Sequence, residues 1–233
     1  MSGEWVQHFA WIAAAAGLGF LIAALFAGRL KMRRWKFLIP YVVLSGVLFR
    51  LYIFWSETDI LDLLTEGLLW GTVAAVLIGA FMVFSVKRQP ASRRLQGSQF
   101  AVDLLWSGLV YGSIDALLLG VLPVLATMNA FAQAGWGSDL GNDIVVGLVA
   151  IASSALVTMA YHAGYPEFRN RKILMPTFAL ALGALGYVVT GSPVPVLLPH
   201  IAMHIAAVVH GPEGTVQLPP HYKSLADSDG AKT

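Results

Sequence analysis

The chain has no cysteine and little charge. Its 233 residues include no Cys, and only 12% are Asp, Glu, Lys or Arg. The absence of cysteine excludes a disulfide scaffold, a thiolate zinc site, an iron–sulfur cluster and a cysteine nucleophile. Soluble domains carry roughly 25% charged residues. This scarcity of charge, with 57% hydrophobic residues, argues against a soluble globular protein. It also excludes intrinsic disorder, which requires low hydrophobicity and high charge.

Several catalytic and binding motifs are also missing. The last apolar segment has no lysine, which a retinal protein needs there. The sequence contains no Walker A loop, no Gly-x-Ser-x-Gly elbow and no His-Glu-x-x-His zinc motif. These absences set aside the most easily recognised nucleotide-binding, serine-hydrolase and zinc-protease sites.

The sequence is rich in long apolar segments. A transmembrane helix needs about 20 mainly apolar residues to cross a hydrocarbon layer of roughly 30 Å. Seven segments fit this requirement, each bounded by charged or turn-forming residues: Phe9–Ala27, Phe37–Trp55, Gly67–Val86, Val102–Leu125, Ile144–Ala163, Ile173–Thr190 and Val194–His210. Gly191, Ser192 and Pro193 predict a tight turn, so the last two segments should form a hairpin. We predict an all-α bundle of seven transmembrane helices in residues 1–211.

Charges are segregated among the connecting segments. Every Lys and Arg except Arg50 lies in the first, third or fifth connection or in the C-terminal tail. In the N-terminus and in the second and fourth connections, the charged residues are all acidic. Because basic loops stay in the cytoplasm, we predict an outer N-terminus, a cytoplasmic C-terminus and a plasma membrane of the bacterial inner-membrane type. Membrane lipids explain the basic loops, so lipids are expected partners and nucleic acid is not.

The tail, residues 212–233, is predicted to be cytoplasmic. Gly211 and Pro212 end the last helix, and the Pro-Pro-His-Tyr stretch that follows favours an extended conformation. Two alternatives are open for this Pro-rich part: it folds back under the bundle, or it binds a partner. From Ser224 onwards the composition predicts disorder.

A few ionisable residues lie inside the predicted spans, where they are costly and mark sites or internal pairs. At about 1.5 Å per residue, four share an outer-to-middle depth: Arg50, Asp115, His200 and His204. Another group lies near the cytoplasmic face: Asp103, His162 and His210. Polar rows at i+4 spacing indicate that the fourth, fifth and seventh spans line a common interior. Gly108 and Gly112 allow close helix approach beside one of these rows.

His200 and His204 form the most chemically specific motif. At i,i+4 they project from one face of a helix and can bind one metal ion. Asp115 would complete or orient this site. We interpret the motif as a zinc site for hydrolysis. In this interpretation His200 and His204 are the metal ligands. Asp115 is a general base or a supporting acid, and Arg50 tunes Asp115. Alternatively, the histidines are helix-interface residues, and Arg50 simply pairs with Asp115.

Seven spans, an intramembrane Asp115 and the His200-x-x-x-His204 motif resemble the superfamily of alkaline ceramidases and progestin/adiponectin-type receptors. That resemblance implies a zinc-dependent intramembrane amidase fold in which Asp115, His200 and His204 serve the metal. The chain departs from the family pattern on its second span, which has Ser45 but no histidine for a third ligand. The family's aspartate also lies on an earlier helix.

A rival interpretation uses the same polar interior without hydrolysis. His162 and His210 lie on different spans at one depth, as axial ligands of a b-type haem do. The protein would then be a haem or quinone redox subunit, a transporter or an assembly protein, with other membrane subunits as partners. The leading prediction is a metal-dependent hydrolase of a lipid or amide substrate, with zinc as cofactor and haem b as the alternative.

Overall fold

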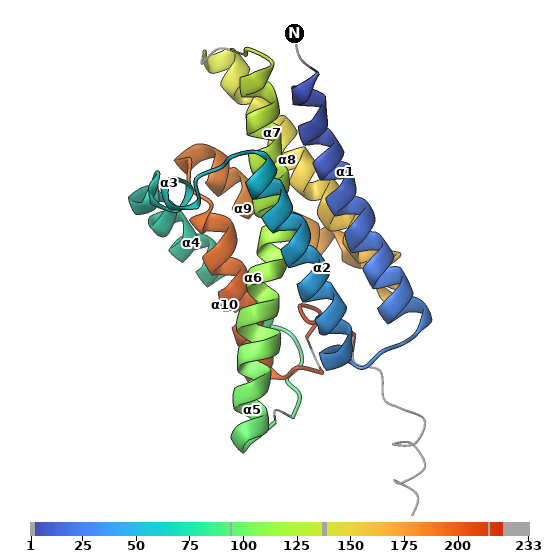
Figure 1. Cartoon of the computed structure of the whole chain (residues 1–233). Coiled ribbons are helices and arrows are strands. Elements are labelled where there is room, and N and C mark those ends of the chain that lie inside the picture. Colours follow the sequence, from blue (N-terminus) through green and yellow to red (C-terminus); the bar gives the residue numbers. More distant parts are fainter. Residues whose placement is uncertain (1–2, 94, 137–138, 214, 221–233) are drawn as a thin grey trace, which may run out of the picture.

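The structure is a computed structural model that describes residues 3–93, 95–136, 139–213 and 215–220 (Figure 1). The described residues are helices joined by turns, without a β-strand. The α-helices are α1 Glu4–Ile22, α2 Arg34–Trp55, α3 Ile60–Thr65, α4 Leu68–Lys87, α5 Gly97–Asp103, α6 Tyr111–Ala116, α7 Leu122–Gln133, α8 Leu140–Ala163, α9 Leu174–Thr190 and α10 Val194–His210. π-helical segments extend α1 (Ala23–Arg29) and join α5, α6 and α7 into one continuous helix (Leu104–Val110 and Leu117–Val121). Two 3-10 turns precede α9: Pro166–Phe168 and Arg171–Ile173.

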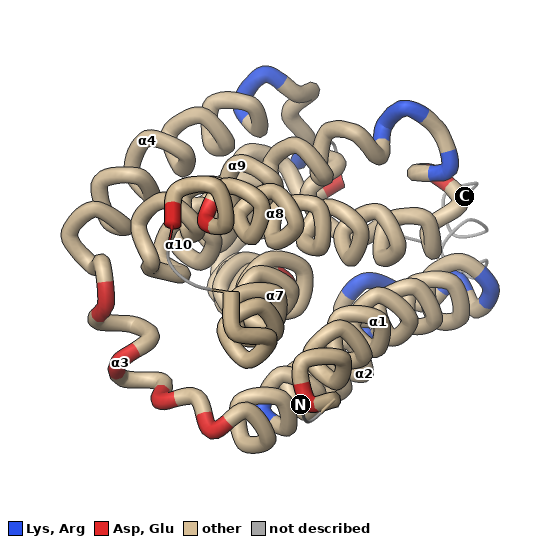
Figure 2. Tube along the Cα trace, turned by 90° about the horizontal axis from the view of Figure 1, so that it is seen from above, with Lys and Arg blue, Asp and Glu red and all other residues tan. Residues whose placement is uncertain are grey.

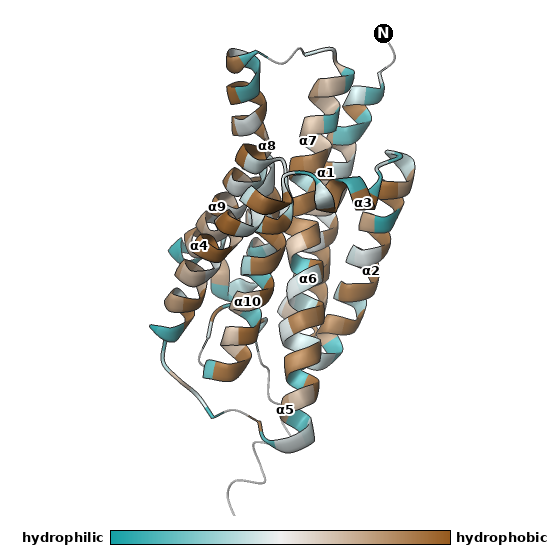
Figure 3. Cartoon of the chain, turned by 90° about the vertical axis from the view of Figure 1, so that its left-hand side faces the viewer, coloured by the Kyte–Doolittle hydropathy of each residue, from teal (hydrophilic) through white to brown (hydrophobic). Residues whose placement is uncertain are grey.

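Six helical stretches among the described residues are long and apolar enough to cross a membrane. A shorter apolar helix of 17 residues, α10, accompanies them. Hydrophobic residues cover the middle of the helices, and hydrophilic ones collect towards the connections (Figure 3). The expected all-α, multi-pass architecture is therefore confirmed.

Each predicted span corresponds to an observed helix, and α10 has the predicted bounds. The fourth is longer than predicted, running over 37 residues from Gly97 to Gln133. The prediction that this span ends at Leu125 is wrong. Asn129 stays within the helix because its side-chain amide donates to the Tyr52 hydroxyl at 3.1 Å, which satisfies a polar group inside the bundle.

The long helix formed by α5, α6 and α7 lies at the centre of the bundle. In its most apolar stretch 72% of the residues are buried, against 28–33% of the residues in the corresponding stretches of the other five membrane-length helices. α10 packs along α6 and α4, while α1 packs on α7 and α8. Gly108 and Gly112 lie at a close helix approach as the sequence predicts, and the neighbouring helix is α10: a methyl group on Gly112 would lie 3.2 Å from the Cα atom of Ile201.

The turn between α9 and α10 is as tight as the sequence predicts. Gly191 ends α9 in the left-handed region, with φ at 71°, and its amide donates to the Tyr187 carbonyl. Glycine adopts this conformation without a Cβ clash. The turn returns α10 alongside α9 and places its histidines beside the central helix.

The charged connections lie at opposite ends of the bundle. Figure 2, viewed from the end that carries the N-terminus, shows acidic positions along the connection that contains α3. Lys31, Arg88 and Arg171 belong to connections at the other end. We refer to these as the acidic end and the basic end.

The first part of the C-terminal tail folds back onto the basic end. Residues 211–213 and 215–220 lie against the bundle, where Leu218 is 3% exposed. Arg34 donates to the Pro219 and Pro212 carbonyls at 2.7 and 2.6 Å. Of the two alternatives for the Pro-rich stretch, folding back is therefore confirmed for these residues. The predicted disorder from Ser224 onwards lies outside the described residues.

Candidate metal centre

Asp115 lies at the middle of the central helix and is 3% exposed. It belongs to α6, between the two π-helical segments that interrupt this helix; such segments are frequent at functional sites. Its carboxylate has a separate partner on each oxygen. The Tyr41 hydroxyl donates to Oδ1 at 2.5 Å, and His200 Nε2 lies 2.7 Å from Oδ2.

His204 reaches the same carboxylate from one turn further along α10. Its Nε2 lies 3.6 Å from Asp115 Oδ2, which is beyond hydrogen-bonding distance. The side chain is 1% exposed, and neither ring nitrogen has a hydrogen-bond partner among the described residues. Its ring meets the Tyr111 ring edge-on, with centroids 4.7 Å apart. A buried imidazole with both nitrogens unpaired costs free energy, and a ligand bound to one of them would reduce that cost.

Asp115, His200 and His204 have the spacing of a metal site. One ligand atom from each lies within 4.8 Å of the others. Zinc bonds of about 2.0–2.1 Å in tetrahedral geometry place ligand atoms about 3.3 Å apart. The 3.6 Å separation between Asp115 and His204 fits this value, and the 2.7 Å contact with His200 must open slightly. Three protein ligands leave a fourth position for water or substrate, as in catalytic zinc sites.

A cavity adjoins the cluster. Its volume is about 40 Å³, and its lining includes all three members of the cluster together with Tyr111 and His162. The remaining walls are mainly apolar and come from α9, α10 and the tail: Met175, Pro176, Ala179, Leu180, Met203, Val216 and Gln217. The cavity therefore has one polar side in an otherwise apolar enclosure.

His162 lines this cavity, although its sequence position placed it nearer the cytoplasm than the cluster. Its Nδ1–H donates to the Thr158 carbonyl at 2.8 Å, so the polar row predicted on this helix is present. His210, its proposed partner in haem binding, has different surroundings. His210 Nε2–H donates to the Gln89 carbonyl at 2.8 Å, and His210 is not among the residues that line the cavity.

Arg50 is exposed and lies apart from the cluster. It lines a shallow surface hollow near the acidic end with Glu57 and Asp59. At 100° per residue, Arg50 is about 180° around α2 from Tyr41, the residue that does contact Asp115. The structure therefore does not bring Arg50 to Asp115, and no contact among the described residues joins them.

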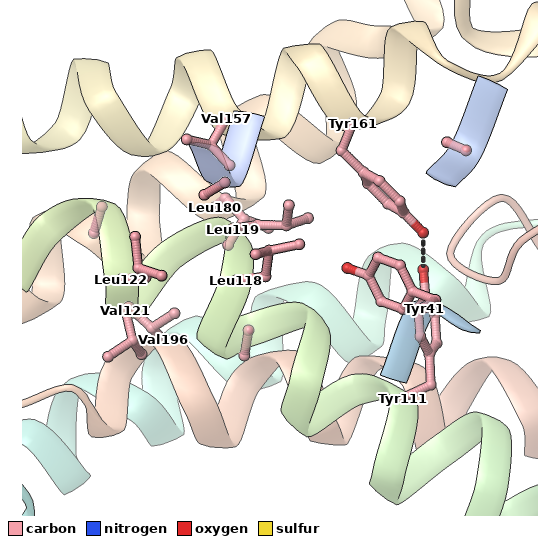
Figure 4. Packing of buried hydrophobic residues seen from close by; sticks show 14 of the residues in the cluster. Tyr41, Tyr111, Leu118, Leu119, Val121, Leu122, Val157, Tyr161, Leu180 and Val196 are labelled. Carbon is pink, nitrogen blue, oxygen red and sulfur yellow. Dashed lines mark hydrogen bonds between the residues drawn. The ribbon is translucent and has the colours of Figure 1, made fainter. Parts of the chain in front are cut away.

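Sequence reasoning missed Tyr41 as a partner of Asp115. Its ring lies 5.1 Å from the Tyr161 ring and 5.4 Å from the Tyr111 ring, measured between centroids. Figure 4 shows these rings together with the hydrogen bond between the Tyr111 and Tyr161 hydroxyls. A signal was available, since a tyrosine within an apolar helix normally finds a hydrogen-bond partner when it is buried.

His8 was also missed, because α1 begins at Glu4 rather than at the predicted Phe9. The His8 side chain is fully buried near the acidic end, with Nδ1 at 3.2 Å from the Tyr52 hydroxyl. It contacts the Trp55 ring as well. This pair is separate from the Asp115 cluster.

Comparisons of the chain with family models, with curated proteins and with solved structures find no match.

Proposed function

We propose that the protein is a metal-dependent intramembrane hydrolase that acts on an amide or ester bond in an apolar substrate. The observation that carries this proposal is the buried group Asp115, His200 and His204, in which His204 has two unpaired nitrogens. Zinc is the metal that best fits two imidazoles and one carboxylate. The sequence resemblance to zinc-dependent intramembrane amidases points in the same direction.

The cavity favours an amphiphilic substrate. Its volume of about 40 Å³ is smaller than the roughly 300–1,000 Å³ of small-molecule sites, so its walls must move apart to admit a substrate. The apolar side chains of Met175, Leu180 and Met203 would hold a hydrocarbon chain. The polar side would hold the carbonyl group to be hydrolysed. A lipid or lipid amide has both features.

The chain's own residues have distinct roles in this proposal. Zinc, when bound, supplies a Lewis acid and activates water. His200, His204 and Asp115 would hold the metal. Tyr41 fixes the carboxylate by donating to Oδ1, which leaves Oδ2 directed at the histidines. His162 presents its Nε2 as a proton acceptor, because its Nδ1–H is committed to a carbonyl.

Metal analysis of the purified protein tests the proposal. The full chain, expressed with zinc and purified in detergent, is expected to contain one zinc per molecule by elemental analysis. His200→Ala and His204→Ala should lose it. His210→Ala is the matched control, since this histidine on the same helix bonds the Gln89 carbonyl. Absence of zinc from the unmutated protein, after reconstitution with excess zinc, would refute the metal centre.

A second candidate is proton handling without hydrolysis, and a chain of tyrosine hydroxyls favours it. Tyr111, which lines the cavity, bonds the Tyr161 hydroxyl at 2.9 Å, and Tyr161 bonds Tyr165 at 2.6 Å. Such a chain can pass protons between the cavity and the basic end. A visible spectrum separates the functions that this candidate includes. A Soret band would identify a haem protein. A protein with neither a chromophore nor zinc would be a transporter or a scaffold.

The topology within the proposal is seven spans with the basic end in the cytoplasm of a bacterial-type inner membrane. α10, at about 25 Å for 17 residues, is short for a span but is surrounded by α4, α6 and α9. Single cysteines introduced into the cysteine-free chain test the orientation. An impermeant thiol reagent applied to intact cells should label Asp62→Cys near the acidic end and not Arg171→Cys at the basic end. The opposite labelling pattern would reverse the orientation.

A further inference from the structure

The segment that follows α10 closes the basic end of the cavity. It begins at Gly211, whose φ of 147° and proximity to the backbone of Ser92 leave no room for a side chain. The segment then contributes Val216 and Gln217 to the lining of the cavity. We refer to residues 211–213 and 215–220 as the C-terminal lid.

Arg34 holds the lid at both ends. Its Nε donates to the Pro219 carbonyl at 2.7 Å and its Nη2 donates to the Pro212 carbonyl at 2.6 Å. Arg34 is 7% exposed at the first turn of α2. A guanidinium presents several donors in a fixed geometry, so one side chain clamps the start and the end of the segment.

Gln89 holds the middle of the lid from the connection after α4. Its side-chain oxygen accepts from the Val216 amide at 2.9 Å, and its side-chain nitrogen donates to the Gln217 side chain at 2.8 Å. The two lid residues that line the cavity are therefore the two that Gln89 holds. The described residues of the lid form neither helix nor strand. Its position depends on these anchors and on the buried Leu218 side chain.

We propose that the C-terminal lid gates the cavity that adjoins Asp115, His200 and His204. With the lid closed, Val216 and Gln217 complete the wall and exclude water from the polar side. When Arg34 and Gln89 release the segment, the cavity opens at the basic end and exchanges its contents. The inference rests on the proposed function in taking this cavity as the substrate site, but gating itself requires no bound metal.

Thiol labelling tests this directly, because the chain has no native cysteine. Met203→Cys places a reporter in the cavity, at a side chain that is 8% exposed. Met82→Cys on α4 is the matched reporter: it is 3% exposed and lies outside the residues that line the cavity. Both are measured in the full chain, in detergent, with a charged water-soluble methanethiosulfonate reagent.

Arg34→Ala and Gln89→Ala are each expected to accelerate labelling of Met203→Cys about tenfold or more. Each substitution removes two hydrogen bonds to the lid, and the loss of each bond shifts an opening equilibrium several-fold. Labelling of Met82→Cys should not change. Arg50→Ala, an exposed arginine on the same helix as Arg34, should leave both rates unchanged.

Two results would refute the proposal that the C-terminal lid gates the cavity. One is an unchanged rate at Met203→Cys in both anchor variants. The other is an equal acceleration at Met203→Cys and Met82→Cys in both, which indicates general loosening of the bundle. Because the assay measures thiol access in metal-free protein, its failure is separate from a failure to find zinc. Loss of zinc binding, conversely, would leave the gating result intact.

Discussion

Gly112→Ala is expected to displace α10 and to weaken the metal centre. A methyl group on residue 112 would lie 3.1 Å from His204 Cδ2 and 3.2 Å from both His204 Cβ and Ile201 Cα. Carbon atoms pack best at about 3.5–4.0 Å, so the neighbouring atoms must move by about 0.3–0.5 Å. Because one of these atoms belongs to the backbone, a side-chain rotation cannot relieve the contact. The whole helix must shift, and it carries both histidines.

The magnitude follows from two opposing terms. Overpacking costs about 1–3 kcal/mol, while replacing a helical glycine with alanine returns up to about 1 kcal/mol. The free energy of unfolding of the metal-free protein should therefore fall by about 0–2 kcal/mol. Zinc binding is more sensitive, because metal–ligand distances tolerate only about 0.2 Å. We expect the zinc dissociation constant to rise about tenfold to a hundredfold, as it does when groups that support the ligands are disturbed.

Calorimetric zinc titration and thermal unfolding in detergent measure the two effects. Gly17→Ala on α1 is the control, since a methyl group there meets nothing within 4 Å. It should bind zinc as the unmutated protein does and unfold at the same or a slightly higher temperature. If Gly112→Ala also bound zinc with unchanged affinity, the close approach of α6 and α10 would not set the ligand geometry, and the reasoning would be refuted.

Three further substitutions test the surroundings of the site by thermal unfolding. Tyr41→Phe should lower the free energy of unfolding by about 1–3 kcal/mol, because Asp115 loses the donor to Oδ1; no change would mean that water replaces the hydroxyl. Tyr52→Phe leaves His8 and the Asn129 amide without their shared partner and should cost a similar amount while zinc content stays unchanged; a loss of zinc would contradict the separation of the two clusters. Arg50→Ala should change stability by no more than about 0.5 kcal/mol, since Arg50 is exposed, and a larger loss would indicate a structural role that the contacts do not reveal.

The helices and the core of the site were predictable from the sequence for a simple physical reason. Hydrocarbon demands long apolar runs with internally satisfied backbones, so the spans appear directly as apolar segments. The i,i+4 spacing of His200 and His204 fixes their shared face whatever the tertiary structure. Depth along the helix then matched Asp115 to them. Gly112 marked the helix surface that approaches α10.

The side of each helix that faces its neighbours in the bundle was not predictable. The sequence placed Arg50 and Asp115 at one depth, but depth does not determine which side of α2 faces inwards. Tyr41 and Tyr52 lie about 20° apart around α2 at 100° per residue, and both are fully buried. That inward stripe was available in the sequence and would have directed Arg50 outwards. The return of the C-terminal lid was less accessible, because it depends on Arg34, which looks like any other basic residue in a loop.

The hydrogen bonds of His204 decide between a ligand-binding site and a polar interior that serves only helix packing. If packing were its role, His204 would be a net cost, because both of its nitrogens are buried without a partner among the described residues. His204→Leu should then raise the free energy of unfolding by about 1–3 kcal/mol in chelator. With zinc present, the unmutated protein gains binding free energy that the variant lacks, so the order of stability should invert. His200→Leu serves as the control, because it deprives Asp115 of a 2.7 Å partner and should destabilise the protein in both conditions. If His204→Leu were more stable than the unmutated protein both in chelator and in zinc, the histidine would have no ligand to hold, and the site would be a packing defect in the helix interface.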